Sequence, residues 1–319
     1  MQTGPVSRLP STIRSTALAL AVDTVTAEVV TAMRGAGVRP LLLKGPSIAG
    51  WLYADGAARP YADSDLLVSP GTYRRAAKVL WDLGFRSLGY LSQQHFDSDA
   101  WARSDHALVD LHRSFVGVGA SPEIVWKEFA AETETQRVGG IDVEVLGVSK
   151  RALHVALHAA QHGVDDERPL EDLRRAVKTV DGETWREAAE IARRIDALPA
   201  FVAGLRLEPD GALLAKRLQL SPERRPLVVL RSGPHVPVAV TLERLASEGS
   251  FRARTRLLVA ALFPSPGYMR KWAARGARAG SGAAWRDRPR LILAYMWRPI
   301  WILLQLPRAI AAVRRARRA

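Results

Sequence analysis

The stretch LLLKGPSIAGWLYADGAARPYADSDLLVS, residues 41–69, decides the fold of this chain. It contains an apolar strand, a tight turn at Lys44-Gly45, an amphipathic helix, and the acidic step Asp63-Ser64-Asp65 entering a second apolar strand. Side chains two positions apart on a strand point to the same face, so both carboxylates face one side. Carboxylate oxygens bind a hard cation such as Mg²⁺, and a glycine turn entering a helix binds phosphate. The stretch therefore indicates metal-dependent chemistry on a nucleotide.

The composition permits one large or two modest domains with a real hydrophobic core. The chain has 319 residues, of which 48% are hydrophobic, and no cysteine. The lack of cysteine excludes disulfides, thiolate zinc sites and cysteine nucleophiles, and it fits a reducing compartment. Asp23 and Glu28 interrupt the apolar N-terminal stretch, which argues against a secretory signal. We therefore expect a cytoplasmic protein.

The positive charge of the chain is concentrated at its C-terminal end. The formal net charge is +14, and residues 250–319 contain 16 Lys or Arg against the single acidic residue Asp287. Residues 1–249 are close to neutral. The high overall charge therefore describes the last segment and does not indicate a nucleic-acid-binding core.

The patterns around residues 41–69 predict a mixed α/β domain. Upstream, residues 11–37 have apolar side chains at helical spacing and end in two glycines. Downstream, we expect a helix over 72–83, strands over 85–91 and 107–115, and a further strand, Ile141 to Val145, within 138–146. The fold class that follows is α+β, with a mixed sheet and helices in the first part of the chain.

From residue 149 the sequence becomes helical. Short loops separate the segments, which predicts a bundle: 150–163, 169–181, 183–196, 198–206, 210–219 and 240–248. A further helix is expected over 251–263, and Gly267 to Arg290 has the composition of a loop. The expected parts are an α/β domain over 1–148, a helical domain over 149–263, and a basic, partly apolar segment over 264–319.

A third acidic residue occurs inside a later apolar strand. Asp110 lies in the run Ala107-Leu108-Val109-Asp110-Leu111-His112. It can lie beside Asp63 and Asp65 if the two strands are neighbours. We interpret His112 as mainly structural, pointing to the opposite side from Asp110.

Several motifs together resemble a known family. They are Leu42-Leu43-Lys44-Gly45, Leu52-Tyr53, Arg59, Asp63-Ser64-Asp65-Leu66-Leu67-Val68, Asp110-Leu111-His112, and the helical series Leu153-His154, His158, His162, Leu170 and Asp172-Leu173. Their combined spacing resembles the bacterial uncharacterised nucleotidyltransferases of the DNA polymerase beta-like nucleotidyltransferase superfamily, over roughly residues 38–178.

The resemblance implies two-metal transfer of a nucleoside monophosphate from a nucleoside triphosphate to a hydroxyl of a small-molecule, glycan or peptide acceptor. Asp63 and Asp65 would hold the Mg²⁺ that carries the triphosphate. Asp110 would hold a second ion, activate the acceptor hydroxyl and accept its proton. Mn²⁺ is an alternative to Mg²⁺.

The same resemblance assigns the nucleotide to Lys44, Gly45, Ser47 and Arg59. The Gly45 turn would bind phosphate oxygens with the Ser47 hydroxyl as a donor, and Lys44 or Arg59 would offset phosphate charge. One departure is Pro46, which interrupts the usual Gly-Ser step and donates no N–H. This leaves open a catalytically inactive nucleotide- or partner-binding protein on the same fold.

Three histidines recur every four residues and so share one helix face. His154, His158 and His162 can contact the nucleotide or acceptor across the cleft, bind a transition metal, or serve packing and hydrogen bonding. We place them in the substrate cleft.

Residues 291–319 join a 16-residue apolar run to a basic tail. The run is shorter than the roughly 20 residues that span a bilayer, and Arg298 and Pro299 interrupt it. It can instead lie at an anionic membrane surface, or pack on the bundle and leave its basic end in solvent. The tail carries no strong nucleic-acid signature, although it keeps an RNA-directed nucleotidyltransferase among the alternatives.

Overall fold

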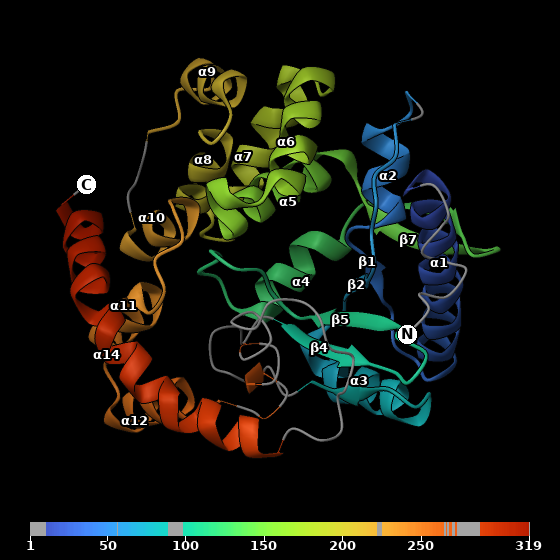
Figure 1. Ribbon diagram of the computed structural model, residues 1–319. Coiled ribbons are helices and arrows are strands. Elements are labelled where there is room, and N and C mark those ends of the chain that lie inside the picture. Colours follow the sequence, from blue (N-terminus) through green and yellow to red (C-terminus); the bar gives the residue numbers. More distant parts are fainter. Residues whose placement is uncertain are drawn as a thin grey trace.

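Seven strands form one mixed sheet at the centre of the protein (Figure 1). The structure is a computed structural model that describes residues 11–55, 57–88, 98–221, 225–264, 266, 268, 269, 272 and 288–318. The strands are β1 (Leu41–Leu42), β2 (Ser64–Leu67), β3 (Arg86–Ser87), β4 (Ser98–Ala102), β5 (Leu108–His112), β6 (Thr133–Val138) and β7 (Ile141–Leu146). Their order across the sheet is β3-β4-β5-β2-β1-β7-β6. The mixed sheet followed by helices confirms the predicted α+β fold class.

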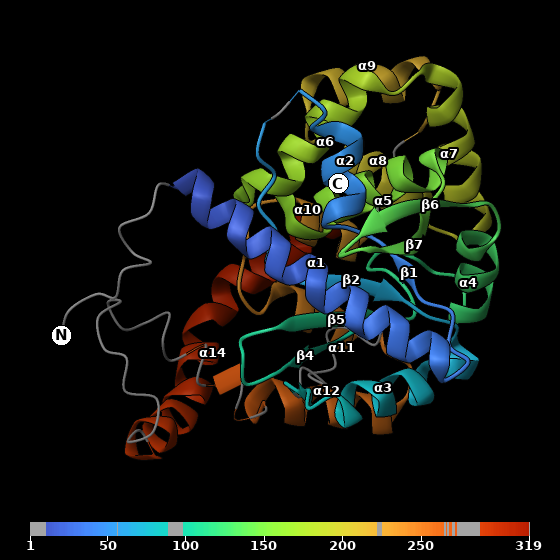
Figure 2. The same cartoon turned by 90° about the vertical axis from the view of Figure 1, so that its right-hand side faces the viewer.

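Helices cover both faces of this sheet. On one face lie α1 (Ser11–Gly35) and α3 (Tyr73–Asp82), and Figure 2 shows α1 running across the strands. The opposite face packs against the helical half, which begins with α5 (Val148–His162). The other helices are α2 (Pro46–Leu52), α4 (Pro122–Ala130), α6 (Glu167–Thr179), α7 (Gly182–Arg194), α8 (Leu198–Leu205), α9 (Pro209–Arg217), α10 (Pro226–Ser232), α11 (Ala239–Ser247), α12 (Phe251–Leu262) and α14 (Arg288–Arg318).

Alternation along the strands turns the acidic residues toward the helical half. The apolar neighbours of Asp65 and Asp110, namely Leu66, Val109 and Leu111, enter the core beneath α1 and α3. Because successive side chains of a strand point to opposite faces, the two carboxylates face the other way. Burial of the apolar residues therefore fixes the side on which the acids lie.

Helix α1 is long and apolar enough over Ile13–Gly35 to cross a membrane, judged by length and composition alone. The core helix of a folded domain passes the same test. Here Val29, Val30 and Met33 are fully buried in the core that α1 shares with the sheet. The C-terminal half of α1 therefore belongs to the core, whereas the window as a whole is 33% buried.

A single apolar cluster runs across residue 148. It joins Leu67 and Leu146 of the sheet to Leu153 of α5, Trp185 of α7 and Phe201 of α8. The sheet and the helical half therefore share one apolar core. The division of the chain into parts at residues 148 and 263 stays a prediction.

Among the described residues, two strands and two α-helices were not predicted from the sequence: β4, β6, α4 and α10. Strand β6 lies at the edge of the sheet and carries the largely polar sequence TETQRV, so it lacks a buried face to reveal it. Helices α4 and α10 have nine and seven residues, too few for a clear helical period.

The C-terminal apolar run is part of a longer helix than expected. Helix α14 has 31 residues and continues through Pro299 and Pro307 into the basic tail. Of the loop predicted over Gly267 to Arg290, residues 268, 269 and 272 are helical, and 288–290 form the first turn of α14. The rest of that predicted loop lies outside the described residues.

Close packing of α8 against α5 depends on Gly204. A Cβ atom at Gly204 would lie 1.9 Å from the backbone oxygen of Ala156. We expect Gly204→Ala to push α8 away from α5 and to lower the free energy of unfolding by about 1–3 kcal/mol, measured by urea denaturation. The matched control is Gly182→Ala in α7, where a Cβ meets nothing within 4 Å. Equal stability of the two variants would contradict this account.

Candidate active site

The predicted carboxylates meet in one cavity between the sheet and the helical half. Strands β2 and β5 run parallel with Asp65 directly opposite Asp110. Asp63 precedes β2 by one residue, and all three acids line a cavity of about 240 Å³. Asp65 is almost fully buried, whereas Asp63 and Asp110 are half-buried. Strands β2 and β5 are therefore neighbours, the condition under which Asp110 was expected to lie beside Asp63 and Asp65.

Lys44 neutralises the most buried of these acids. It follows β1, which pairs antiparallel with β2, and its Nζ lies 2.8 Å from Asp65 Oδ1. Burial alone would lower the pKa of Lys44, but the negative charges of Asp65, Asp63 and Asp110 outweigh it and raise that pKa. Lys44 is therefore a charged ammonium on the floor of the cavity.

His112 lies on the same side as Asp110, so its interpretation as a residue of the opposite side is wrong. The two residues are two positions apart on β5, a spacing that places them on one face. His112 Nε2 lies 3.2 Å from Asp65 Oδ1. Ligand atoms of Asp65, Asp110 and His112 all lie within 4.8 Å of one another.

This group fits a divalent cation. Carboxylate oxygens are the ligands that hard divalent ions take, and imidazole nitrogen adds a ligand that suits transition ions. Asp63 lines the same cavity but does not belong to the tight group. The metal-ligand set expected from the sequence was Asp63, Asp65 and Asp110, so the close set contains His112 in the place of Asp63.

The three carboxylates differ in their proton affinity. Burial would raise the pKa of Asp65, but Lys44 and His112 outweigh it and hold that pKa well below its usual range. Burial and the charge of Asp65 raise the pKa of Asp110 to about 6. The same two causes raise the pKa of Asp63. At neutral pH the site therefore gathers negative charge, which Lys44 and Arg168 offset in part.

The turn before α2 has the predicted glycine conformation. Gly45 caps α2 with φ 65° and ψ −122°, a region that favours glycine. A Cβ there would lie 3.4 Å from the ring of Tyr61, whose hydroxyl donates to Asp23 at 2.9 Å. Gly45 lines the cavity. Ser47 is fully buried, its hydroxyl lacks a hydrogen-bond partner in the described part of the chain, and it does not line the cavity.

Arg59 is engaged by a carboxylate of the helical half. Its Nε and Nη2 donate to the two oxygens of Asp172 on α6 at 2.8 and 2.6 Å, and Tyr53 also donates to Asp172 at 2.8 Å. Both ends of the ion pair are nearly fully buried. Arg59 is among the residues that line the cavity, and its role toward a nucleotide stays a prediction.

Arg168 is a cavity residue that sequence reasoning missed. It lies in the first turn of α6, lines the cavity and is exposed. Within the described residues its side chain forms no ion pair, which distinguishes it from Arg59. Its charge lowers the pKa of Asp63. An arginine at the start of a polar helix gives no signal in a single sequence that could have marked it.

The three histidines line the wall opposite the carboxylates. His154 is buried, His158 is half-buried and His162 is exposed, where its Nδ1 lies 3.1 Å from Asp166 Oδ2. Burial and then the charge of Lys44 lower the pKa of each, for His154 to about 3. Both ring nitrogens of His154 lack a hydrogen-bond partner within the described residues. The three histidines therefore line the cavity, as expected, and the imidazoles of His154 and His158 are neutral.

More than half of this chain matches a known protein family. Residues 11–209 match the family described as uncharacterised nucleotidyltransferase. Because the match covers more than half of the chain, this protein belongs to that family of nucleotidyltransferases. A comparison with curated proteins found no match.

Solved structures that are similar to this chain include the following two. One is the solution structure of the antibiotic-resistance factor ANT(2'')-Ia, with 17% identity and a TM-score of 0.39 over 57% of this chain and 95% of that one. The other is an antigenic nucleotidyltransferase-like protein from Paracoccidioides brasiliensis, with 14% identity and a TM-score of 0.33 over 59% and 92%. At this level of similarity neither structure indicates a substrate for this protein.

The raised pKa of Asp110 has a consequence for stability. Between pH 3.8, the usual pKa of an aspartate, and about pH 6, the Asp110 carboxyl loses its proton more readily in the unfolded chain than in the folded one. The metal-free protein therefore loses stability as the pH rises through this window. We expect Asp110→Asn to be more stable than the wild type by about 1–3 kcal/mol at pH 8 and nearly equal at pH 4. Urea denaturation in EDTA measures this difference. The control is Asp82→Asn, which removes an exposed carboxylate of α3. A difference in stability between Asp110→Asn and the wild type that does not change with pH would contradict the prediction.

Proposed function

We propose that this protein transfers a nucleoside monophosphate from a nucleoside triphosphate to a hydroxyl of a small-molecule, glycan or peptide acceptor, with a divalent cation. The observation that supports it most is the pairing of Asp65 with Asp110 across two parallel strands, beside Lys44, in a cavity walled by the helical half. The family supplies the reaction class, and the acceptor class and cation dependence are part of the proposal.

The residues of the cavity have distinct roles in this proposal. Asp65 and Asp110 hold the cation, which when bound neutralises the triphosphate and acidifies the acceptor hydroxyl. Asp110 lines the cavity beside Asp65, where its carboxylate can accept the proton of the acceptor hydroxyl. Lys44 and Arg168 offer positive charge to phosphate oxygens. Pro46 leaves the Gly45 turn with one fewer N–H donor.

Calorimetric titration of the four nucleoside triphosphates, each with Mg²⁺ and with Mn²⁺, tests the proposal. We expect Asp65→Asn to weaken nucleotide binding at least tenfold and to abolish pyrophosphate release in the presence of acceptors, because it removes the most buried ligand. The matched control is Asp82→Asn, an exposed carboxylate of α3.

Two results would count against transfer. A wild type that binds no nucleoside triphosphate contradicts the proposal outright. Metal-dependent binding without pyrophosphate release, across hydroxyl acceptors of each class and RNA, would support the inactive binding protein on this fold.

We also propose that α14 seats the protein on an anionic membrane from the cytoplasmic side. One face of the helix is apolar and exposed over three turns: Leu293, Met296, Trp297, Ile300, Leu303 and Leu304 are 48–67% exposed. Arg308, Arg314, Arg315 and Arg318 continue the exposed surface, and the helix contains no acidic residue. An exposed apolar stripe beside arginines suits the boundary of an anionic bilayer.

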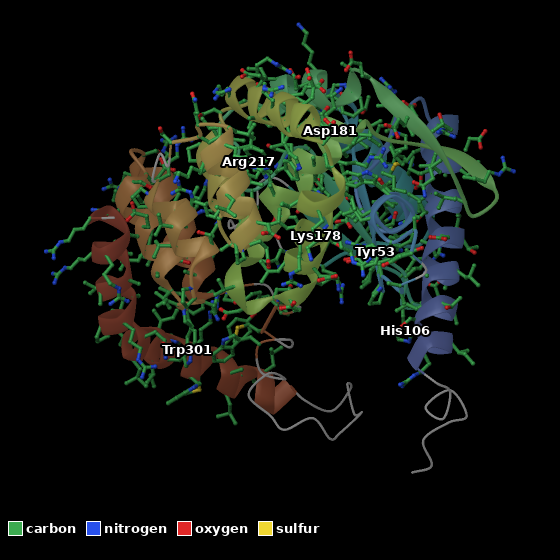
Figure 3. All side chains as sticks on the ribbon, turned by 90° about the horizontal axis from the view of Figure 1, so that it is seen from above. Tyr53, His106, Lys178, Asp181, Arg217 and Trp301 are labelled. Carbon is green, nitrogen blue, oxygen red and sulfur yellow. The ribbon has the colours of Figure 1, made fainter. Side chains whose placement is uncertain are left out.

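The opposite face of α14 is committed to the protein. Arg298 is nearly buried and donates to the backbone oxygen of Ala261 at 2.7 Å, and Arg317 pairs with Glu243 of α11 at 2.8 Å. Figure 3 shows Trp301 on this helix at the edge of the molecule far from α1. The helix is therefore held with its apolar stripe outward.

Vesicle co-sedimentation tests this surface. We expect binding to phosphatidylserine-containing vesicles, weaker binding to phosphatidylcholine alone, and loss of binding in the double variant Ile300→Asp, Leu303→Asp, which places charge in the apolar stripe. The control is Leu213→Asp on α9, which is 60% exposed and apolar like the test positions. Unchanged binding in the double variant, or none by the wild type, would contradict the proposal.

A further inference from the structure

In the group formed by Asp65, Asp110 and His112, one imidazole nitrogen lies among carboxylate oxygens. His112 Nε2 and Asp65 Oδ1 are 3.2 Å apart. Two neighbouring ligands of an octahedral ion with bonds of about 2.1 Å lie about 3 Å from each other. The observed separation therefore suits two ligands of one ion as well as it suits a hydrogen bond.

The position of His112 is set by the sheet and not by a mobile loop. It is the last residue of β5, paired with Leu67 of β2 on one side and with Ser98 of β4 on the other. Its side chain is 14% exposed and lines the cavity. Strand pairing on both sides holds the imidazole where the carboxylates of Asp65 and Asp110 converge.

We propose that His112 is a nitrogen ligand of the catalytic cation together with Asp65 and Asp110, so that the site prefers a first-row transition ion such as Mn²⁺ to Mg²⁺. The catalytic role of this ion rests on the proposed function, but its binding does not. Mg²⁺ takes oxygen ligands and releases its waters reluctantly. Imidazole is a normal ligand of first-row transition ions.

Asp63 is then not a ligand of this cation, which is the role expected from the sequence. It lies outside the tight ligand group but lines the same cavity as Lys44 and Arg168. Its carboxylate adds negative charge to the cavity without belonging to this group. A site of two carboxylates and one imidazole carries one negative charge fewer than three carboxylates, which further weakens it for Mg²⁺.

Pulsed electron paramagnetic resonance of the full chain with Mn²⁺ alone tests the nitrogen ligand. We expect ¹⁴N coupling from a directly bound imidazole in the wild type and its loss in His112→Asn and in His112→Asp. Competition titration should show at least a tenfold preference for Mn²⁺ over Mg²⁺, reduced in His112→Asp, which offers oxygen instead. The control is His106→Asn, an exposed histidine with φ 71°, a conformation that asparagine tolerates. Thermal melts confirm that each variant is folded.

The outcomes separate this inference from the proposed function. Bound Mn²⁺ without ¹⁴N coupling, or coupling that survives in both folded His112 variants, overturns the nitrogen ligand even if nucleotide transfer is observed. Coupling that depends on His112 in a protein that transfers no nucleotide supports the ligand while the proposed function fails. A wild type that binds neither ion overturns the nitrogen ligand, while the proposed function is decided separately by the nucleotide titration.

Discussion

The structure depends on one buried carboxylate. Asp65 is 1% exposed, and an isolated charge in such a place would cost several kcal/mol. Lys44 and His112 share its Oδ1 atom at 2.8 and 3.2 Å and make the charge tolerable. Lys44 follows β1 and His112 ends β5, the two strands on either side of β2. The order of the central strands β5-β2-β1 is therefore also the order in which the site is assembled.

A second buried ion pair fixes the wall opposite this carboxylate. Arg59 comes from the segment between α2 and β2, and Asp172 comes from α6. Removing one member of such a pair leaves an uncompensated buried charge, which is strongly unfavourable. The pair and the continuous core across residue 148 hold the helical half against the sheet. The position of the histidine wall relative to the carboxylates is thus supported by packing and by this ion pair.

Much of this could be predicted from the sequence, because the signals were local. The apolar residues on each side of Asp65 and Asp110 predict strands with the acids on one face, and the glycines around α1 and α3 mark their ends. The partners could not be predicted. Nothing in the sequence indicates that Arg59 pairs with Asp172, and Arg168 reaches the cavity only because α6 begins at its rim.

His112 shows how a small error in local geometry can hide a functional group. Its spacing of two from Asp110 already places both on one face, so the sequence alone could have assigned it to the site. What the sequence could not supply is the parallel pairing of β5 with β2, which brings its Nε2 to Asp65. The side of a strand is a property of spacing, whereas the chemistry of that side depends on which strand lies next to it. In this protein the pairing of β5 with β2 brings Asp65, Asp110 and His112 together, with their ligand atoms within 4.8 Å of one another.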